Sequence, residues 1–358
     1  MKILLAILLG LHGAIHYLGF AKSRNPDSIP ALKEPIGTTM GYFWAMAAVV
    51  LVSSGVLLLL QNKMWWQIAL VGIVLSQILI FTAWSDSSKG TILNILLLIP
   101  VILAALGHFQ LQKAERAFDE IRNPIPLEAE ISSEYPNAFL KYISFSQVMV
   151  ESYQSNIFEV HQTGKMRPNP SGNWMNFTAR QLFRTATHEF VWYTEVDLPL
   201  KTHMYGLDRY VDGKGMMDIS ALGAFAVVEE RGVHIDKGAL IRYIAELNWI
   251  PTQLFHPEID ISAENQNSFT VRIPKVDADA AVTFHLDDEG RLLRLTAIRP
   301  IDAENEYPWR IELDTNSYTE MNGAFIAQKA SLFWDMPEGE NHWLDIEVTS
   351  IESSSSSK

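Results

Sequence analysis

The stretch that decides the fold is residues 40–61, MGYFWAMAAVVLVSSGVLLLLQ, which contains no Asp, Glu, Lys or Arg. As a helix, about 20 apolar residues cross the hydrocarbon core of a bilayer. Three further runs of this kind occupy residues 3–20, 64–84 and 91–111, and none has a charged residue in its interior. A buried core helix could explain one such run, but not four in the first third of a chain. The sequence therefore predicts four transmembrane helices within residues 1–112.

Charge divides the chain at the same place. Residues 1–112 carry six Lys/Arg and three Asp/Glu, a net charge of +3, and the whole chain carries −13, which leaves −16 for the remainder. Phosphate binding requires clustered Lys and Arg, so we expect no nucleic-acid partner. The chain has no cysteine, which excludes disulfides, thiolate metal sites and cysteine nucleophiles.

This division predicts four parts: a transmembrane domain at 1–112, a linker at 113–135, a β-rich soluble domain at 136–352 and a serine-rich tail at 353–358. Asn123-Pro124-Ile125-Pro126 ends the helix that leaves the membrane, because proline cannot continue a helix.

Four spans place the N-terminus and the soluble domain on the same side of the membrane. Five Lys/Arg near the membrane on that side and four on the other leave the orientation open.

Polar side chains inside membrane spans suggest function by default. His12 and His16 are four residues apart and share one helix face. A rise of about 1.5 Å per residue puts Gln77 level with His16 and Ser53 nearly level with His12, whereas His108 lies near a helix end. We therefore interpret the two histidines as partners in interhelical hydrogen bonds. A haem, quinone or proton-relay role is the alternative.

The acidic part has the pattern of an antiparallel sheet. Runs rich in aromatic and β-branched residues predict strands at 174–183, 190–196, 202–211, 268–273, 281–286, 292–299, 310–319, 324–332 and 342–351. Met321-Asn322-Gly323 predicts a hairpin, since Asn-Gly is the strongest short turn signal. The fold class is therefore four transmembrane helices followed by an α+β domain built on a curved antiparallel sheet.

One helical insertion interrupts the strands. Leu240, Ile244 and Leu247 recur at helical spacing and predict a helix over 236–247, with Asp236 as its N-cap. Shorter helices are expected at 137–143 and 252–255.

Several multi-residue motifs resemble a known family. They are Gly164-Lys165-Met166-Arg167, Trp174, Arg242-Tyr243-Ile244-Ala245-Glu246 and Trp249-Ile250-Pro251-Thr252. Together they resemble a family of uncharacterised bacterial membrane-associated proteins, a domain of unknown function, over residues 154–351. The resemblance implies an integral protein of the bacterial cytoplasmic membrane and supplies no catalytic assignment.

A looser similarity concerns shape: successive hairpins with an Asp/Gly turn at 287–290 resemble the half-barrel carriers of lipids and lipoproteins. The domain is also rich in large rings: Trp174, Trp192, Trp249, Trp309, Trp334 and Trp343. A pocket lined by aromatic rings with a few polar groups would suit a membrane lipid or another amphiphilic ligand. The candidate ligand-binding residues are Asp208, Arg242, Glu246, Trp249, Arg299 and Trp309. The alternative is that the rings fill the core.

An enzyme is the second hypothesis. Arg242 and Glu246 lie on one helix face, and Asp208, Asp212 and Arg299 could approach them. A buried Glu beside Arg could act as acid or base, but it could equally be an i,i+4 ion pair that anchors the helix to the sheet, which we favour. The histidines of this part are scattered, so we predict no metal site and no cofactor. A structural or assembly role is the third hypothesis.

Overall fold

The structure is a computed structural model that describes residues 2–125, 134–148 and 156–354. The chain divides into two compact units, Met1–Phe109 and Gln110–Lys358. Part of the predicted linker, at 126–133, and the end of the predicted tail, at 355–358, lie outside the described residues.

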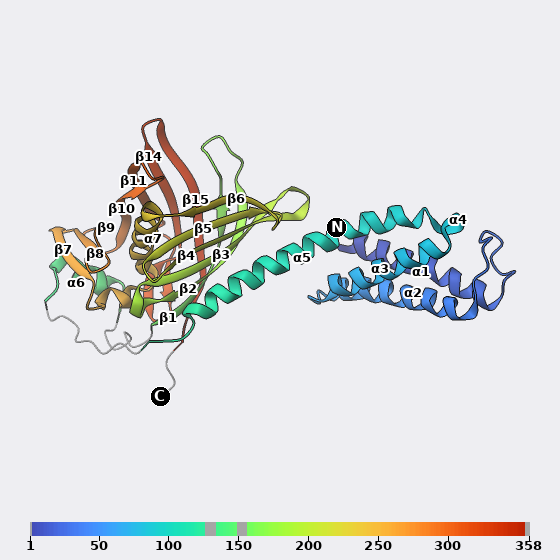
Figure 1. The fold of residues 1–358 in the computed structure, drawn as a ribbon. Coiled ribbons are helices and arrows are strands. Elements are labelled where there is room, and N and C mark those ends of the chain that lie inside the picture. The colour runs from blue at the N-terminus through green and yellow to red at the C-terminus, as the bar shows by residue number, and fades with distance from the viewer. Residues whose placement is uncertain (1, 126–133, 149–155, 355–358) are drawn as a thin grey trace. The chain divides into compact units, whose positions relative to one another are not determined.

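The first unit is helical (Figure 1). Its helices are α1 (Lys2–Arg24), α2 (Thr38–Leu59), α3 (Trp65–Thr82), the short α4 (Trp84–Ser87) and α5 (Gly90–Ile121), whose end belongs to the second unit. All except α4 are long and apolar enough to cross a membrane, which confirms the four predicted helices. Gly13 lets α1 approach α2 closely, because a Cβ there would lie 2.8 Å from the carbonyl oxygen of Ala48.

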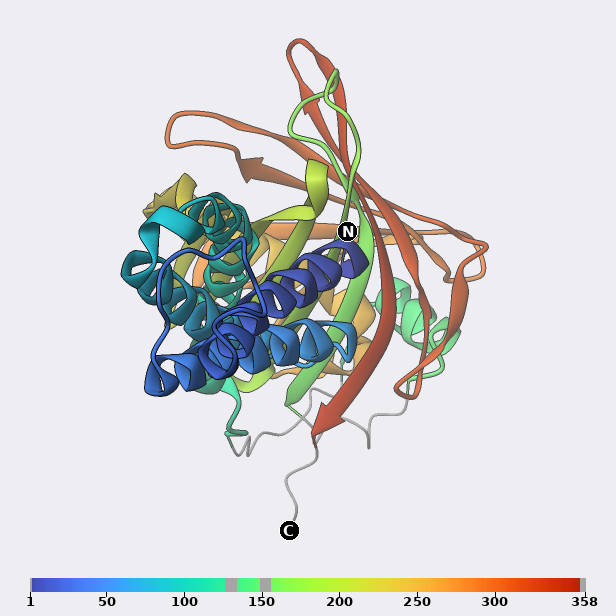
Figure 2. The same ribbon diagram turned by 90° about the vertical axis from the view of Figure 1, so that its right-hand side faces the viewer.

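The second unit is built on an open, curved antiparallel sheet of thirteen strands, as expected from the sequence (Figure 2). Its order is β6-β5-β4-β3-β2-β1-β15-β14-β11-β10-β9-β8-β7, and β12 and β13 form a separate hairpin. The strands are β1 (Ile157–Met166), β2 (Met175–Arg184), β3 (Glu189–Leu198), β4 (Thr202–Val211), β5 (Lys214–Ala221), β6 (Phe225–Arg231), β7 (Asp260–Asn265), β8 (Ser268–Ile273), β9 (Asp277–Leu286), β10 (Leu292–Pro300), β11 (Glu306–Leu313), β12 (Tyr318–Met321), β13 (Ala324–Ala327), β14 (Lys329–Met336) and β15 (Gly339–Ser354). The first and last strands pair with each other at the centre of the sheet.

Both faces of the sheet are covered near β3. Phe190 and Trp192 point into the concave core, and Val191 and Tyr193 point to the other face, as strand alternation requires. That second face packs against the end of α5, whose buried side chains recur at three- and four-residue spacing: Ala114, Ala117, Phe118 and Ile121.

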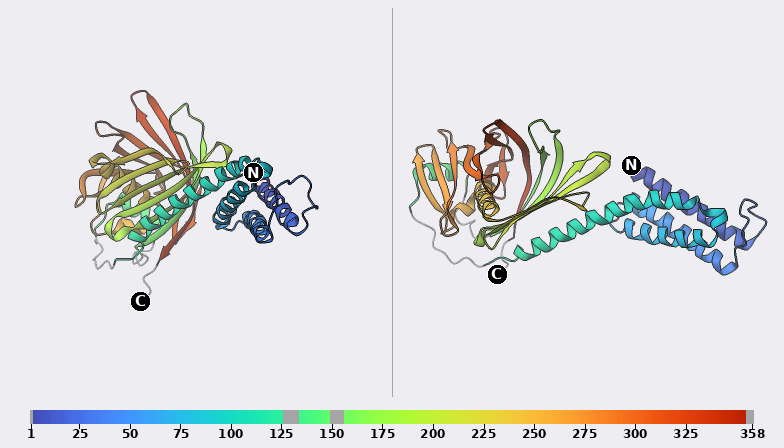
Figure 3. Two further views of the ribbon diagram at one scale, coloured as in Figure 1. Left: turned by 45° about the vertical axis from the view of Figure 1, so that its right-hand side comes forward. Right: turned by 45° about the horizontal axis from the view of Figure 1, so that its top comes forward.

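The concave face holds four further helical segments (Figure 3). They are α7 (Val233–Glu246), the 3-10 turns Leu247–Trp249 and Pro251–Phe255, and α6 (Asn137–Phe145), which packs near β7 and β8. Leu240 and Ile244 of α7 are buried in the main hydrophobic core. Because α7 lies inside the curve of the sheet, its polar face and the concave strand faces can meet.

The predicted strands need four corrections. The predicted strand at 310–319 is wrong, because β11 ends at Leu313 and the chain turns at Asp314, whose carboxylate accepts the N–H of Asn316 at 2.9 Å. The predicted strand at 324–332 is divided between β13 and β14, although the hairpin at Asn322 and Gly323 is confirmed, with positive φ at both residues. The strands β1, β5, β6 and β7 were not predicted. Finally, β15 continues to Ser354, two residues into the predicted tail.

Asp236 is not the N-cap of the helix. Gly232, at φ 123°, precedes the first turn, and α7 therefore begins three residues earlier than expected. The carboxylate of Asp236 instead accepts the backbone N–H of Gly215 at 2.7 Å and the ammonium of Lys214 at 3.0 Å. This residue thus ties the start of α7 to β5.

Candidate functional site

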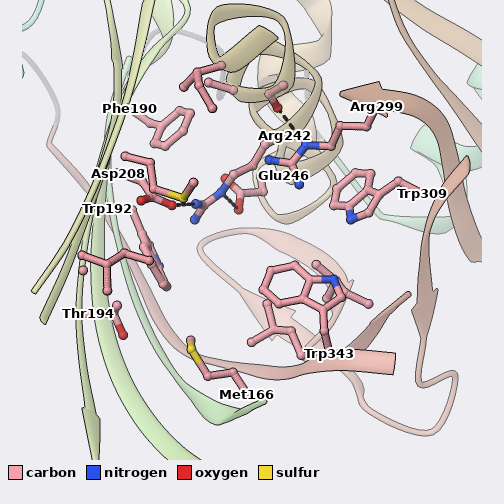
Figure 4. Close-up of a pocket in the computed structure, with 18 of the residues that line it drawn as sticks. Met166, Phe190, Trp192, Thr194, Asp208, Arg242, Glu246, Arg299, Trp309 and Trp343 are labelled. Atoms are coloured by element: carbon pink, nitrogen blue, oxygen red, sulfur yellow. Dashed lines mark hydrogen bonds and ion pairs between the residues drawn. The ribbon is translucent and has the colours of Figure 1, made fainter. Parts of the chain in front are cut away.

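A cavity of about 310 Å³ lies between α7 and the concave face of the sheet (Figure 4). Its lining includes all six residues that the sequence nominated: Asp208, Arg242, Glu246, Trp249, Arg299 and Trp309. Asp212, which we expected to approach them, is instead an exposed residue of the β4–β5 turn, where its φ is 51°. All six nominated residues therefore line one cavity, and only Asp212 lies outside it.

Three elements bring the charged groups together. Asp208 stands on β4 directly opposite Trp192 of β3, so both side chains face the concavity. Arg242 and Glu246 are one helical turn apart on α7. Arg299 comes from β10, on the other half of the sheet. The site thus depends on the sheet curving around α7.

Arg242 is the centre of the ion pairs. Its Nε donates to Oε1 of Glu246 at 2.8 Å, and one terminal nitrogen donates to Oδ2 of Asp208 at 2.9 Å. The guanidinium carbon lies 4.7 Å from the ring centroid of Trp192 and 5.1 Å from that of Phe190. This arrangement holds the arginine by charge and by cation–π contact.

Glu246 also ends a chain of side-chain amides. The indole N–H of Trp192 donates to Gln162 Oε1 at 2.8 Å, and Gln162 Nε2 donates to Gln181 Oε1 at 3.2 Å. Gln181 Nε2 then donates to the second carboxylate oxygen of Glu246 at 2.6 Å. Both oxygens of Glu246 are therefore occupied, which favours the structural interpretation of the Arg242–Glu246 pair over an acid–base role.

Arg299 is bound differently. Its Nε donates to the carbonyl oxygen of Gly238 at 3.0 Å, and its guanidinium carbon lies 4.9 Å from the ring centroid of Trp309 and 5.6 Å from that of Trp334. Within the described ranges 2–125, 134–148 and 156–354, Arg299 makes no ion pair and its terminal nitrogens have no acceptor. The half-buried guanidinium is thus clamped by rings rather than by carboxylates.

Burial sets the electrostatics of this group. Burial, reinforced by the nearby charge of Arg242, lowers the pKa of Arg299 to about 10, so the side chain stays charged at neutral pH. Burial also raises the pKa of Asp208, against the opposing effects of Arg242 and Arg299. For Arg242, burial disfavours the charge, but Glu246 and Asp208 outweigh it and raise the pKa.

Most of the remaining lining is apolar. Its apolar residues come from β1, β3, β4, β5 and the first half of β15: Met166, Val196, Met204, Ile219, Trp343, Leu344 and Ile346. In the close-up, Met166 and Thr194 lie across the cavity from Arg242 and Arg299 (Figure 4). One cavity therefore has a charged region beside α7 and an apolar region opposite.

A family comparison identifies the domain. Residues 125–346 match the model of a family of unknown function, DUF6544. The chain belongs to this family. The resemblance to an uncharacterised family is therefore confirmed. A comparison with proteins of curated function finds no match.

Two solved structures resemble parts of this DUF6544 protein. A DUF1329 family protein from Desulfovibrio piger has a TM-score of 0.35 and 9% identity, over 62% of this chain and 93% of that one. A β-barrel-like DUF1849 protein from Brucella abortus has a TM-score of 0.19 and 9% identity, over 56% of this chain and 99% of that one. At these TM-scores neither likeness carries an argument about function.

The DUF6544 domain also brings together side chains that the sequence analysis considered scattered. Ring nitrogens of His188 and His256 and a carboxylate oxygen of Glu258 lie within 4.8 Å of one another. His256 Nδ1 accepts the backbone N–H of Glu258 at 3.1 Å, so its proton is on Nε2, and the carboxylate of Glu258 is paired with Lys275 at 2.8 Å. A metal ion on His256 Nε2 would move the ring proton to Nδ1 and break its hydrogen bond to Glu258, and His188 Nε2 already lies 3.2 Å from the second carboxylate oxygen of Glu258, so the present geometry does not favour a metal ion.

The membrane candidates form a separate polar group in the first unit. His12 Nε2 lies 2.7 Å from Asn94 Oδ1 and 3.1 Å from Ser76 Oγ, and His16 Nε2 lies 2.7 Å from the same serine oxygen. The three helices α1, α3 and α5 thereby share one buried hydrogen-bond network. Interhelical hydrogen bonds are therefore present at both histidines, as we interpreted them.

The partners of the histidines differ from those expected. Gln77 bonds to Asn94 at 3.0 Å and to Thr91 at 3.1 Å rather than to a histidine. Ser53 is exposed on the outside of α2, and His108 contacts the ring of Trp66. The rise per residue gives the depth of a residue in the membrane but not its direction around the helix axis. Gln77 and Ser53 were therefore expected at the correct depth, although their side chains do not point towards the histidines.

Sequence reasoning missed Gln162 and Gln181. Each is fully buried and inward-facing. The sequence contained a signal for Gln181, which occupies one of the alternating, otherwise apolar positions Phe177, Ala179 and Phe183. A polar residue at a core position of a strand predicts a buried partner.

Proposed function

We propose that the soluble domain of this protein binds an amphiphilic ligand in the cavity between α7 and the sheet, close to the membrane to which the apolar helices attach it. One observation carries the proposal: a single cavity has Arg242 and Arg299 at one side and a largely apolar lining at the other. Ligand sites of this size class are mostly apolar with a few placed polar groups. Attachment to the bacterial cytoplasmic membrane is an expectation that rests on the early resemblance.

The cavity also meets the size expected of a small-ligand site. Its volume of about 310 Å³ is at the lower end of the range of roughly 300–1,000 Å³ for such pockets. A medium acyl chain, or one chain of a larger lipid, is therefore a better fit than a complete two-chain lipid.

Photo-crosslinking tests this proposal. The full chain in nanodiscs of zwitterionic lipid is incubated with a decanoic acid that carries a diazirine, irradiated and digested, and the labelled peptides are mapped. We expect labels on cavity strands such as β1, β4 and β15. Met204→Trp, which fills the apolar side, should reduce them, whereas Val227→Trp, at an exposed position of β6 that does not line the cavity, should not.

The result that would overturn the proposal is equally definite. Labels confined to the membrane-spanning helices, with none on the cavity strands of the unmodified chain, would show that the probe enters only the bilayer. Equal labelling of the cavity in the two tryptophan variants would exclude this cavity as the place of binding.

A further inference from the structure

We propose that the ligand is an anion whose carboxylate or phosphate head group binds the terminal nitrogens of Arg299. This inference rests on the proposed function, because it assigns the chemical class of the ligand in the same cavity. It starts from the difference between the two arginines there. Arg242 has two carboxylate partners, and Arg299 has none among the residues that the structure describes.

The guanidinium of Arg299 is held in place before any ligand binds. The hydrogen bond from Nε to Gly238 fixes one edge of the guanidinium plane, and the neighbouring rings of Trp309 and Trp334, 4.9 and 5.6 Å from the guanidinium carbon, restrict its movement further. The remaining edge carries the two terminal nitrogens, which form the planar fork that matches a carboxylate or a phosphate. A preorganised fork loses little conformational entropy when it binds an anion.

The charges of the cavity point the same way. Asp208 and Glu246 are both hydrogen-bonded to Arg242, and Glu246 also accepts Gln181. Neither carboxylate has a direct bond to Arg299. A half-buried cation without a partner loses part of its hydration without compensation, and arginine does not lose its proton at neutral pH. An incoming anion would therefore supply the one charge partner that the described residues do not.

The apolar lining fixes the orientation of the ligand. The head group would lie beside α7, and the acyl chain would extend towards Met166 and Thr194 on the opposite side (Figure 4). Val196, two residues further along β3 from Thr194, is almost completely buried, and the lining residues that come from β1 and β15 are all apolar or aromatic. A ligand with charge at both ends would leave one charge unpaired there, so a single acidic head group fits best.

Competition with three matched ligands tests the inference. The full chain in zwitterionic nanodiscs is photolabelled as above in the presence of decanoate, decyl phosphate or 1-decanol. These competitors share one chain length and differ in the head group. We expect at least one anion to compete roughly tenfold to hundredfold better than 1-decanol, the range expected for a charged hydrogen bond. The two anionic arms distinguish a carboxylate ligand from a phosphate ligand.

Variants of Arg299 provide the second arm. Arg299→Gln should reduce the preference for the anion to less than about threefold while 1-decanol still competes, and Arg299→Lys should retain part of the preference. Arg294→Gln removes an arginine from the exposed face of the same strand and should change nothing. If Arg299→Gln does not fold, the comparison of anion and alcohol in the unmodified chain still decides.

Each negative result refutes a different part of the proposal. Equal competition by all three compounds at the cavity peptides would refute the anionic head group and leave the proposed function standing. A preference for the anion that persists in Arg299→Gln would refute the role of this arginine. No labelling of the cavity peptides in any arm would refute the proposed function itself.

Discussion

Replacing Glu246 with glutamine should destabilise the second unit by more than its change in volume suggests. The amide chain runs in one direction, from the indole N–H of Trp192 through Gln162 and Gln181 to the carboxylate. Its two ends, Trp192 and Arg242, can only donate hydrogen bonds. The acceptor-only carboxylate of Glu246 therefore accommodates donors from both directions. Glutamine at position 246 would be a third amide in the chain, and its NH2 group would meet another donor. Rotating any of the three amides by 180° removes that donor–donor contact only by creating one at the next link.

The magnitude follows from what is lost. The charge-assisted bond from Arg242 is 2.8 Å long, and such bonds contribute about 1.5–3 kcal/mol. The unavoidable donor–donor contact leaves at least one buried N–H without a partner, at a cost of about 1–3 kcal/mol. Arg242 keeps its bond to Asp208, so we expect about 3 kcal/mol rather than the upper limit. For a unit of this size, that corresponds to a decrease in Tm of roughly 6–12 °C.

Thermal unfolding of the full chain in nanodiscs, followed by tryptophan fluorescence, measures the effect. Glu304→Gln is the matched control at an exposed position and should shift the Tm by no more than about 1–2 °C. Trp192→Phe removes one donor-only end of the chain, so it should cost less in the Glu246→Gln background than in the unmodified protein. A decrease no larger than the control, or additivity of the two substitutions, would refute the directional chain.

Three further outcomes are expected from unfolding measurements. Gly215→Ala should cost about 1–3 kcal/mol, because its Cβ would lie 2.5 Å from a backbone oxygen of α7, whereas Gly238→Ala meets only ordinary contacts inside α7 and should be neutral or stabilising by up to about 1 kcal/mol. Burial lowers the pKa of His188 to about 4 from 6.5, so the unfolded chain binds a proton that the folded chain does not. Stability is complete above pH 6.5 and should fall by about 3 kcal/mol as the pH decreases to 4, a slope that His188→Gln should reduce. In the first unit, Asn94→Leu should cost about 0.6–2 kcal/mol in an SDS titration and Ser53→Ala almost nothing, because only the first is hydrogen-bonded between helices.

Local signals predicted much of this fold. The absence of charge over 20-residue runs defined the membrane helices, and the Asn322-Gly323 pair defined its hairpin. The pairing of β1 with β15 joins segments nearly 190 residues apart, and no local pattern contains that information. The break at Asp314 was missed although a local signal for it was present, since Asp314, Asn316 and Ser317 are turn-forming residues within the predicted strand.

The candidate site was predictable as a set of residues but not as an arrangement. The i,i+4 spacing of Arg242 and Glu246 gave their ion pair directly. The contact between Gln162 and Gln181 depends on strand register, since Gln162 is opposite Ala179 and reaches its partner diagonally. Arg299 lacks an ion-pair partner among the described residues because no carboxylate there points towards it. The direction of each carboxylate is determined only when the chain folds.

The charged side of the cavity is difficult to explain by stability alone. Buried ion pairs often stabilise a domain no better than well-packed apolar residues of the same volume. The core of this unit already contains a large apolar cluster around α7, including Leu240, Ile244 and Trp309. Apolar residues in place of Asp208, Arg242, Glu246 and Arg299 together would remove the desolvation penalty of four charges without interrupting that core. A function that requires charge at the end of an apolar cavity accounts for these residues, and the anionic amphiphile proposed above uses the one arginine that the ion pairs leave over.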